Sequence, residues 1–174
     1  MKFTLLTEEK EWSGVHTEAW MKTFGYEDGT VVTREVIHRP DAIVVVAYDG
    51  EKVYFVSQPR EAVNEEALLE LPAGKVDPGE DIRVAAQREL REEIGYGAKS
   101  WQPLTSFYSS PGFTDEVLHA FLATDLFPAK LVADDDERIN VVSMTVAEIK
   151  QNPSQFKDAK TLVSLLLFLQ NAVE

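Results

Sequence analysis

The run Ala42–Tyr48 constrains the fold of this chain more than any other segment. It reads AIVVVAY and is rich in β-branched residues, which favour a β-strand. Because successive side chains of a strand point to opposite faces of a sheet, a strand that is apolar throughout needs cover on both faces. We therefore expect a layered α/β fold, with helices on both faces of a sheet that contains this strand.

The clearest helix is expected at Asp81–Ile94. Four apolar residues recur at every fourth position and form a stripe along one side of this helix: Ile82, Ala86, Leu90 and Ile94. Gly95 follows directly, at the position where a left-handed C-terminal cap is expected. Such a helix can bury its apolar stripe against the sheet.

Further elements are expected on both sides of this helix. Strands are expected at Lys52–Ser57, Leu68–Leu71, Trp101–Tyr108, Glu116–Ala123 and Ile139–Val142. Shorter β-prone pieces lie near the N-terminus, at Phe3–Leu6, His16–Phe24 and Thr30–His38. Thr145 and Glu148 match a capping box, which predicts a short helix that ends before Pro153, and Ala159–Ala172 predicts a C-terminal helix. We expect one domain over residues 1–174, with an N-terminal β extension at 1–38 and a catalytic unit at 39–174.

The charge and the cysteine content exclude several classes of function. Lys and Arg number 17 against 30 Asp and Glu, which gives a formal net charge of -13. Such a surface repels the nucleic-acid backbone and anionic membranes, so we expect neither as a partner. The chain has no cysteine, which excludes a disulfide, a thiolate metal site and a thiol nucleophile. The mixed N-terminal sequence is not typical of a signal peptide, so we expect a cytoplasmic protein.

Three glutamates converge on one face of the predicted helix. Glu89, Glu92 and Glu93 stand at positions i, i+3 and i+4, so their charges repel one another. A hard divalent cation relieves this repulsion, because Mg²⁺ prefers oxygen ligands and binds through a few carboxylates plus substrate phosphate. Taken alone, the three carboxylates are more typical of a solvated acidic helix face, because such runs are common on protein surfaces.

The wider segment Gly74–Tyr96 decides between these two interpretations. It reads GKVDPGEDIRVAAQRELREEIGY and resembles the Nudix box, whose seven fixed identities all match here. At average amino-acid usage, a chance match at one start point is on the order of 10⁻⁸ to 10⁻⁹. The resemblance implies the Nudix α/β/α sandwich, with a mixed central sheet and an N-terminal antiparallel β extension. It also implies a hydrolase that uses Mg²⁺, with Mn²⁺ as a substitute.

The resemblance to the Nudix box also implies a role for each residue of the pattern. It implies metal ligands at four positions: the backbone carbonyl of Ala73 and the carboxylates of Glu89, Glu92 and Glu93. Glu92 is in addition a candidate catalytic residue. Four further positions are implied to be structural: Gly74, Glu80, Arg88 and Gly95. In this scheme Glu80 ties the loop to the helix, and Arg88 orients the glutamates by ion pairing.

The flanking sequence resembles one branch of the family, the ADP-ribose and nucleoside diphosphate sugar pyrophosphatases. The stretch Glu70–Gly74 precedes the box as in that branch, and Pro111 follows Tyr96 by 15 residues. The acidic run 134–137 resembles the loop that supplies the catalytic base, with Glu137 preferred and Asp135 as the alternative. The branch implies hydrolysis of a diphosphate bond, giving a nucleoside monophosphate and a sugar phosphate.

The same branch implies substrate contacts and a partner. Five residues are candidates for binding a small nucleoside diphosphate sugar: Arg34, Arg60, Glu70, Gly74 and Glu116. A homodimer is also implied, in which N-terminal strands swap onto the partner and the adenine stacks on aromatic side chains. Four residues are candidates for that stacking, with core packing as their competing role: Trp12, Trp20, Phe24 and Tyr26.

Two other functions stay open on the sequence alone. A Nudix enzyme of the same kind can act on a damaged nucleoside triphosphate or a dinucleoside polyphosphate. A non-catalytic Nudix domain can sense a nucleotide or bind a protein, but such domains typically lose the box glutamates, which are all present here.

Overall fold

The computed structural model describes residues 1–131 and 138–171. The chain forms two compact units. The first unit consists of Met1–Asp41 and Tyr108–Val117, and the second of Ala42–Phe107 and Leu118–Glu174.

A mixed sheet forms the centre of the second unit. Five strands follow one another in the order β10 (Asn140–Thr145), β5 (Lys52–Arg60), β4 (Ala42–Tyr48), β9 (Val117–Pro128) and β8 (Tyr96–Tyr108). Two short strands pair beside this path, β6 (Glu65–Glu70) with β5 and β7 (Ala73–Lys75) with β4. Strand β4 runs parallel to β9 and antiparallel to β5 and β7, so the predicted mixed central sheet is confirmed.

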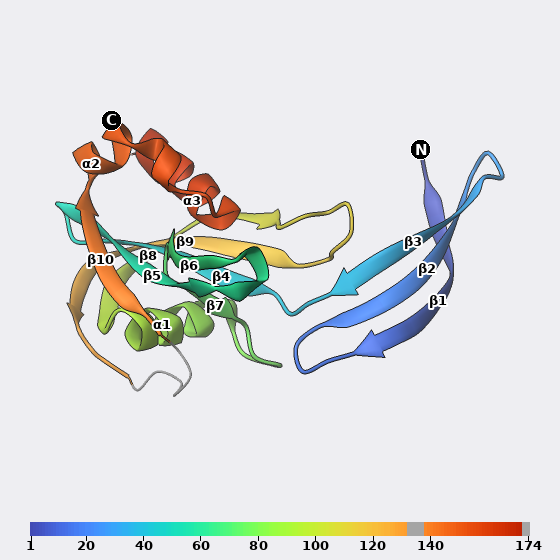
Figure 1. Ribbon diagram of the computed structural model, residues 1–174, viewed down its shortest axis with the longest axis horizontal. Coiled ribbons are helices and arrows are strands. Elements are labelled where there is room, and N and C mark those ends of the chain that lie inside the picture. Colours follow the sequence, from blue (N-terminus) through green and yellow to red (C-terminus); the bar gives the residue numbers. More distant parts are fainter. Residues whose placement is uncertain (132–137, 172–174) are drawn as a thin grey trace. The chain divides into compact units, whose positions relative to one another are not determined.

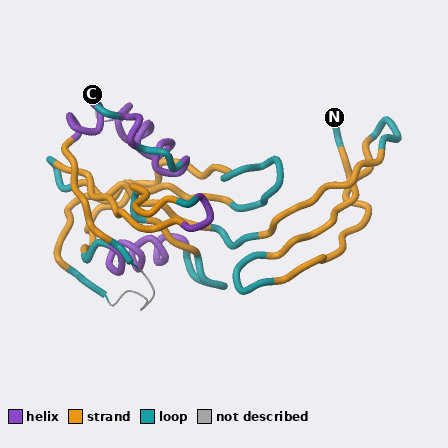
Figure 2. The backbone as a smooth tube through the Cα atoms, viewed as in Figure 1, coloured by secondary structure: helices purple, strands orange, loops and turns teal. Residues whose placement is uncertain are grey.

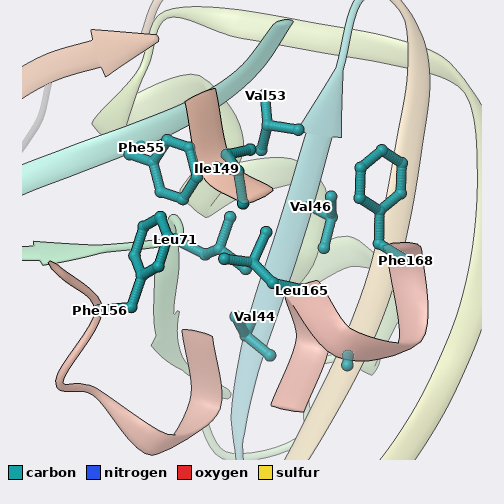
Figure 3. Close-up of a cluster of buried hydrophobic side chains, with 10 residues drawn as sticks. Val44, Val46, Val53, Phe55, Leu71, Ile149, Phe156, Leu165 and Phe168 are labelled. Atoms are coloured by element: carbon teal, nitrogen blue, oxygen red, sulfur yellow. The ribbon is translucent and has the colours of Figure 1, made fainter. Parts of the chain in front are cut away.

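Helices cover both faces of this sheet. Helix α1 (Ile82–Glu93) lies on one face, and α2 (Val146–Gln151) and α3 (Ala159–Asn171) lie on the other (Figure 1). Val44 and Val46 of β4 pack into the cluster that includes Leu165 and Phe168 of α3 (Figure 3). The intervening residues of β4 are also fully buried and pack with α1: Ile43, Val45 and Ala47. The run AIVVVAY is therefore covered on both faces, as predicted.

Local sequence signals set the ends of the helices. Asp81 caps α1, because its side chain accepts hydrogen bonds from the backbone N–H groups of Arg83 and Val84. Gly95 follows α1 with φ of +79°, which confirms the predicted left-handed cap. The capping box of Thr145 and Glu148 at the start of α2 is also confirmed.

Strand β7 is an element that the sequence did not predict. Strand β6 ends at Glu70 before Pro72, as the turn residues indicate, but Ala73–Lys75 then pairs with β4. Strand β5 pairs with β4 only at Ala47 and Tyr48, so the remaining edge of β4 is open to β7. Three residues are too few to show an alternating sequence pattern. They form a strand only because they pair with the edge of β4, which is distant in the sequence.

The first unit contains an antiparallel sheet in the order β1 (Phe3–Ser13), β2 (Glu18–Tyr26) and β3 (Val31–His38) (Figure 2). This confirms the predicted N-terminal β extension. Strand β1 is longer than the β-prone piece at Phe3–Leu6, since it pairs with β2 as far as Ser13 across two register shifts. The acidic residues within β1 disfavour a strand locally, so pairing with β2 determines its length.

The turn around Pro111 also belongs to the first unit. The backbone N–H of Ile37 donates to the carbonyl of Phe113 at 2.7 Å, and the N–H of Asp115 donates to the carbonyl of Ile37 at 3.3 Å. His38 Nδ1 lies 2.7 Å from a carboxylate oxygen of Asp115. The division into an extension at 1–38 and a catalytic unit at 39–174 stays a prediction. In the described parts of the chain, no helix combines the length and apolar character needed to cross a bilayer.

Candidate active site

Strand β7 brings the start of the box to the end of its helix. Pairing with β4 places Gly74 opposite Ile43 and Ala73 opposite Val44. In this position the backbone N–H of Ala73 donates to Glu93 Oε2 at 2.9 Å. Residues twenty positions apart are therefore in direct contact. The backbone of Ala73 and Gly74 lies beside the glutamates of α1.

Gly74 leaves room for the carboxylate of Glu89. A Cβ atom at position 74 would lie 1.9 Å from both Cδ and Oε1 of Glu89, so the carboxylate would have to move. Gly74 therefore allows the Glu89 carboxylate to pack directly on its backbone, and any larger residue there would displace that carboxylate. This close approach explains why the box begins with glycine.

Arg88 binds three of the four box glutamates at once. Its Nε and Nη2 donate to the two carboxylate oxygens of Glu80, at 3.1 and 3.0 Å. Its Nη1 donates to Glu89 Oε1 at 2.7 Å and to Glu92 Oε2 at 3.0 Å, and Nη2 also reaches the carbonyl of Lys75 at 3.0 Å. The hydrogen bonds that Arg88 donates to Glu80 lower the pKa of Glu80 and raise that of Arg88. Arg88 thus fixes the loop and the helix glutamates relative to one another.

Arg60 and Glu70 form a bidentate ion pair next to the box. Arg60 Nε and Nη2 lie 2.6 and 2.8 Å from the two carboxylate oxygens of Glu70. Burial would raise the pKa of Glu70, but the hydrogen bond from Arg60 and the charge of Lys160 outweigh it, so the pKa lies below its usual value. The Glu70 side chain is 1% exposed, whereas that of Arg60 is 41% exposed. Arg60 is thus the partner that an incoming anion can reach.

The other predicted substrate residues lie in the first unit. Arg34 lines a cavity of about 410 Å³ together with Phe24 and Tyr26, two of the four aromatic candidates. Trp12 and Trp20 do not line this cavity, and Phe3 and Tyr108, which the sequence did not suggest, do. Glu116 Oε1 lies 3.5 Å from Arg39 Nε.

Both candidates for the catalytic base, Glu137 and Asp135, lie outside the described residues. Their roles stay predictions from the resemblance. The described part of the site therefore consists of the box segment and the Arg60–Glu70 pair.

Comparison with protein families decides the family. A model of the NUDIX domain matches residues 38–165, which is most of the chain. This chain belongs to the Nudix family. The family predicted from the segment Gly74–Tyr96 is thereby confirmed.

Individual relatives agree with this assignment. The Nudix chain is 34% identical over 165 residues to an ADP-ribose pyrophosphatase of Bacillus subtilis (strain 168), covering 92% of this chain and 89% of the relative. It is 37% identical over 153 residues to a methanol dehydrogenase activator of Bacillus methanolicus, covering 84% and 82%. A crystal structure described as an ADP compounds hydrolase has a TM-score of 0.87 at 23% identity and covers 98% of this chain and 94% of its own. That likeness confirms the predicted Nudix fold.

The Nudix box residues suit a hard divalent cation in their donor chemistry. The carboxylates of Glu89 and Glu93 are buried, with residue exposures of 9% and 7%. Four box glutamates carry four negative charges, and Arg88 offsets one of them. Among residues 1–131 and 138–171, no three acidic or imidazole side chains are grouped so as to enclose a metal ion by themselves. Mg²⁺ is bound in proteins through carboxylate oxygens together with water and substrate phosphate.

Proposed function

We propose that this Nudix protein hydrolyses the diphosphate bond of ADP-ribose or a related nucleoside diphosphate sugar, releasing a nucleoside monophosphate and a sugar phosphate. One observation carries the proposal: Arg88 and Gly74 hold the glutamates of α1 against the backbone of β7. The names of the relatives support the substrate class, since the Bacillus subtilis protein is called an ADP-ribose pyrophosphatase.

Different residues of the chain bind the metal ion, bind the substrate and accept the proton during hydrolysis. Glu89, Glu92, Glu93 and the carbonyl of Ala73 would hold Mg²⁺, or Mn²⁺ in its place, which when bound neutralises the diphosphate and lowers the pKa of a water molecule. Arg88 keeps the glutamates in register, and Arg60 binds diphosphate oxygens. Glu137, or Asp135 in its place, would accept the proton of the attacking water as the P–O bond breaks.

A substrate panel tests this function. Turnover of ADP-ribose is expected to yield AMP and ribose 5-phosphate, and both products can be resolved by anion-exchange chromatography. Damaged nucleoside triphosphates and dinucleoside polyphosphates in the same panel test the other Nudix activities. Turnover of those compounds without cleavage of any diphosphate sugar would reject our proposal.

The name of the Bacillus methanolicus relative suggests a second function. That protein is called a methanol dehydrogenase activator, and it shares 37% identity with this chain. A purified methanol dehydrogenase assayed with and without this chain tests the second function, and an unchanged dehydrogenase rate would exclude it.

We also propose that the aromatic cavity of the first unit binds the nucleobase. The ring of Phe3 packs edge-on against Phe24 with centroids 5.4 Å apart, and Arg34 adds a cation to the same cavity. Phe24→Ala is expected to raise the KM for ADP-ribose about tenfold with little change in kcat, because a stacking surface is lost. Leu166→Ala changes an exposed apolar residue of α3 outside the cavity lining and serves as the control. An unchanged KM in Phe24→Ala would rule out this binding site.

We further propose that the protein is a homodimer and that it acts in the cytoplasm. Strand β1 is exposed along its whole length and carries large apolar residues, with Phe3 61%, Leu6 53% and Trp12 57% exposed. Covering them with a second copy would remove apolar surface from water. Light scattering should give twice the 19.5 kDa of one chain, and a mass of one chain at micromolar concentration would contradict the dimer.

A further inference from the structure

The buried carboxylate of Glu70 is held by two cations rather than one. Arg60 already occupies both oxygens of Glu70 in a bidentate pair. Lys160, the second residue of α3, adds a contact of 2.5 Å from Nζ to Glu70 Oε2. A single bidentate arginine balances the charge of one carboxylate, so the second cation needs an explanation of its own.

Lys160 is itself held firmly in place. Its Nζ also lies 3.0 Å from Asp158 Oδ1, and its side chain is only 16% exposed. The next residue, Thr161, is fully buried and accepts a hydrogen bond of 2.9 Å from the backbone N–H of Leu71, the neighbour of Glu70. Thr161 in turn donates to Asp158 through both its N–H and its hydroxyl group. The start of α3 is thereby fixed to the segment that leads into the box.

The positive charge of Lys160 makes the net charge of the surrounding ion-pair group zero. Arg60 and Lys160 carry two positive charges, while Glu70 and Asp158 carry two negative charges, so the group is formally neutral. The hydrogen bond with Glu70 is the largest cause that raises the pKa of Arg60. The negative charges of Glu70, Glu93 and Asp158 raise this pKa further. Arg60 is therefore within electrostatic reach of the box. Without Lys160 the group would carry one net negative charge and repel an anion.

We propose that Lys160 is a positioning residue of the diphosphate site: it shares the charge of Glu70 and so leaves Arg60 able to bind the substrate. The proposal rests on the proposed diphosphate hydrolysis. Arg60 Nη1 makes no hydrogen bond to any described residue, so its two N–H donors remain for phosphate oxygens. Lys160 acts through Glu70 and touches no reacting atom.

Lys160→Gln tests the effect of the positive charge of Lys160 apart from its hydrogen bond to Glu70. The glutamine amide can still donate to Glu70, which favours a folded protein, but it supplies no positive charge. We expect the KM for ADP-ribose to rise about fivefold to tenfold while kcat stays within about twofold. Lys160→Arg restores the charge and is expected to return KM to near the wild-type value.

Lys157→Gln is the matched control. Lys157 pairs with Glu65 at 2.6 Å on the surface, where its side chain is 64% exposed, so its loss should leave KM unchanged. An unchanged KM in Lys160→Gln, or an equal increase in Lys157→Gln, would overturn the role of Lys160 while hydrolysis by the wild type upholds the proposed function. Absence of ADP-ribose cleavage by the wild type would overturn both.

Discussion

Replacing Glu93 by glutamine is expected to lower kcat for ADP-ribose by about three orders of magnitude while the protein stays folded. Glu93 Oε2 accepts the N–H of Ala73 at 2.9 Å, and a glutamine amide oxygen can accept the same hydrogen bond. The substitution therefore removes a charge from the site and preserves the contact between α1 and β7. Stopped assays at saturating Mg²⁺, with circular dichroism to monitor folding, provide the measurement.

Glu66→Gln is the control for the Glu93 variant. Glu66 is exposed on β6, and its replacement changes the net charge of the chain by the same amount. Its kcat should match that of the wild type. Near-normal turnover by folded Glu93→Gln would show that this glutamate does not act in catalysis.

Replacing Gly74 by alanine is expected to lower kcat/KM about a hundredfold, because a displacement of about 1 Å at a catalytic centre has an effect of that order. The new Cβ would lie 1.9 Å from Glu89 Cδ, so the carboxylate has to move away from the backbone. That movement also disturbs the 2.7 Å contact between Glu89 and Arg88. Steady-state kinetics on ADP-ribose measure the effect.

Gly50→Ala is the control for Gly74→Ala, because it is expected to lower stability without lowering activity. Gly50 lies in the turn after β4 with φ of +102° and open space where a Cβ would be, so alanine there adds backbone strain of roughly 1 kcal/mol. We expect a lower melting temperature but a normal rate for this variant. Wild-type kinetics in Gly74→Ala would contradict the close packing of Glu89 on Gly74.

The fold was predictable where the signal is local. The apolar stripe, Asp81 and Gly95 define α1 within a single segment, and the run AIVVVAY fixes a strand covered on both faces. Strand β7 and the second half of β1 were not predictable, because distant partners make them strands. The pairing of Ile37 with the turn at Phe113 escaped prediction for the same reason.

The candidate site was predictable to a similar extent. The spacing of the box indicates which glutamates share a helix face. Arg88 contacts three of the box glutamates, and its role in orienting them stays a prediction. Lys160 carries no sequence signal of this kind, since 90 residues separate it from Glu70. The oxygens of Glu70 bind Arg60 and Lys160, and the expected contact of Glu70 with substrate stays a prediction.

The dependence of ADP-ribose cleavage on Mg²⁺ tests the central claim most directly. Phosphorus NMR follows the loss of the diphosphate resonances and the appearance of two phosphomonoesters as Mg²⁺ is added to the metal-free protein. We expect no cleavage without the ion, a rate that rises to saturation with Mg²⁺, and no such rise in Glu93→Gln. Equal cleavage by metal-free and Mg²⁺-saturated protein would contradict a site in which the box glutamates bind the ion against the diphosphate.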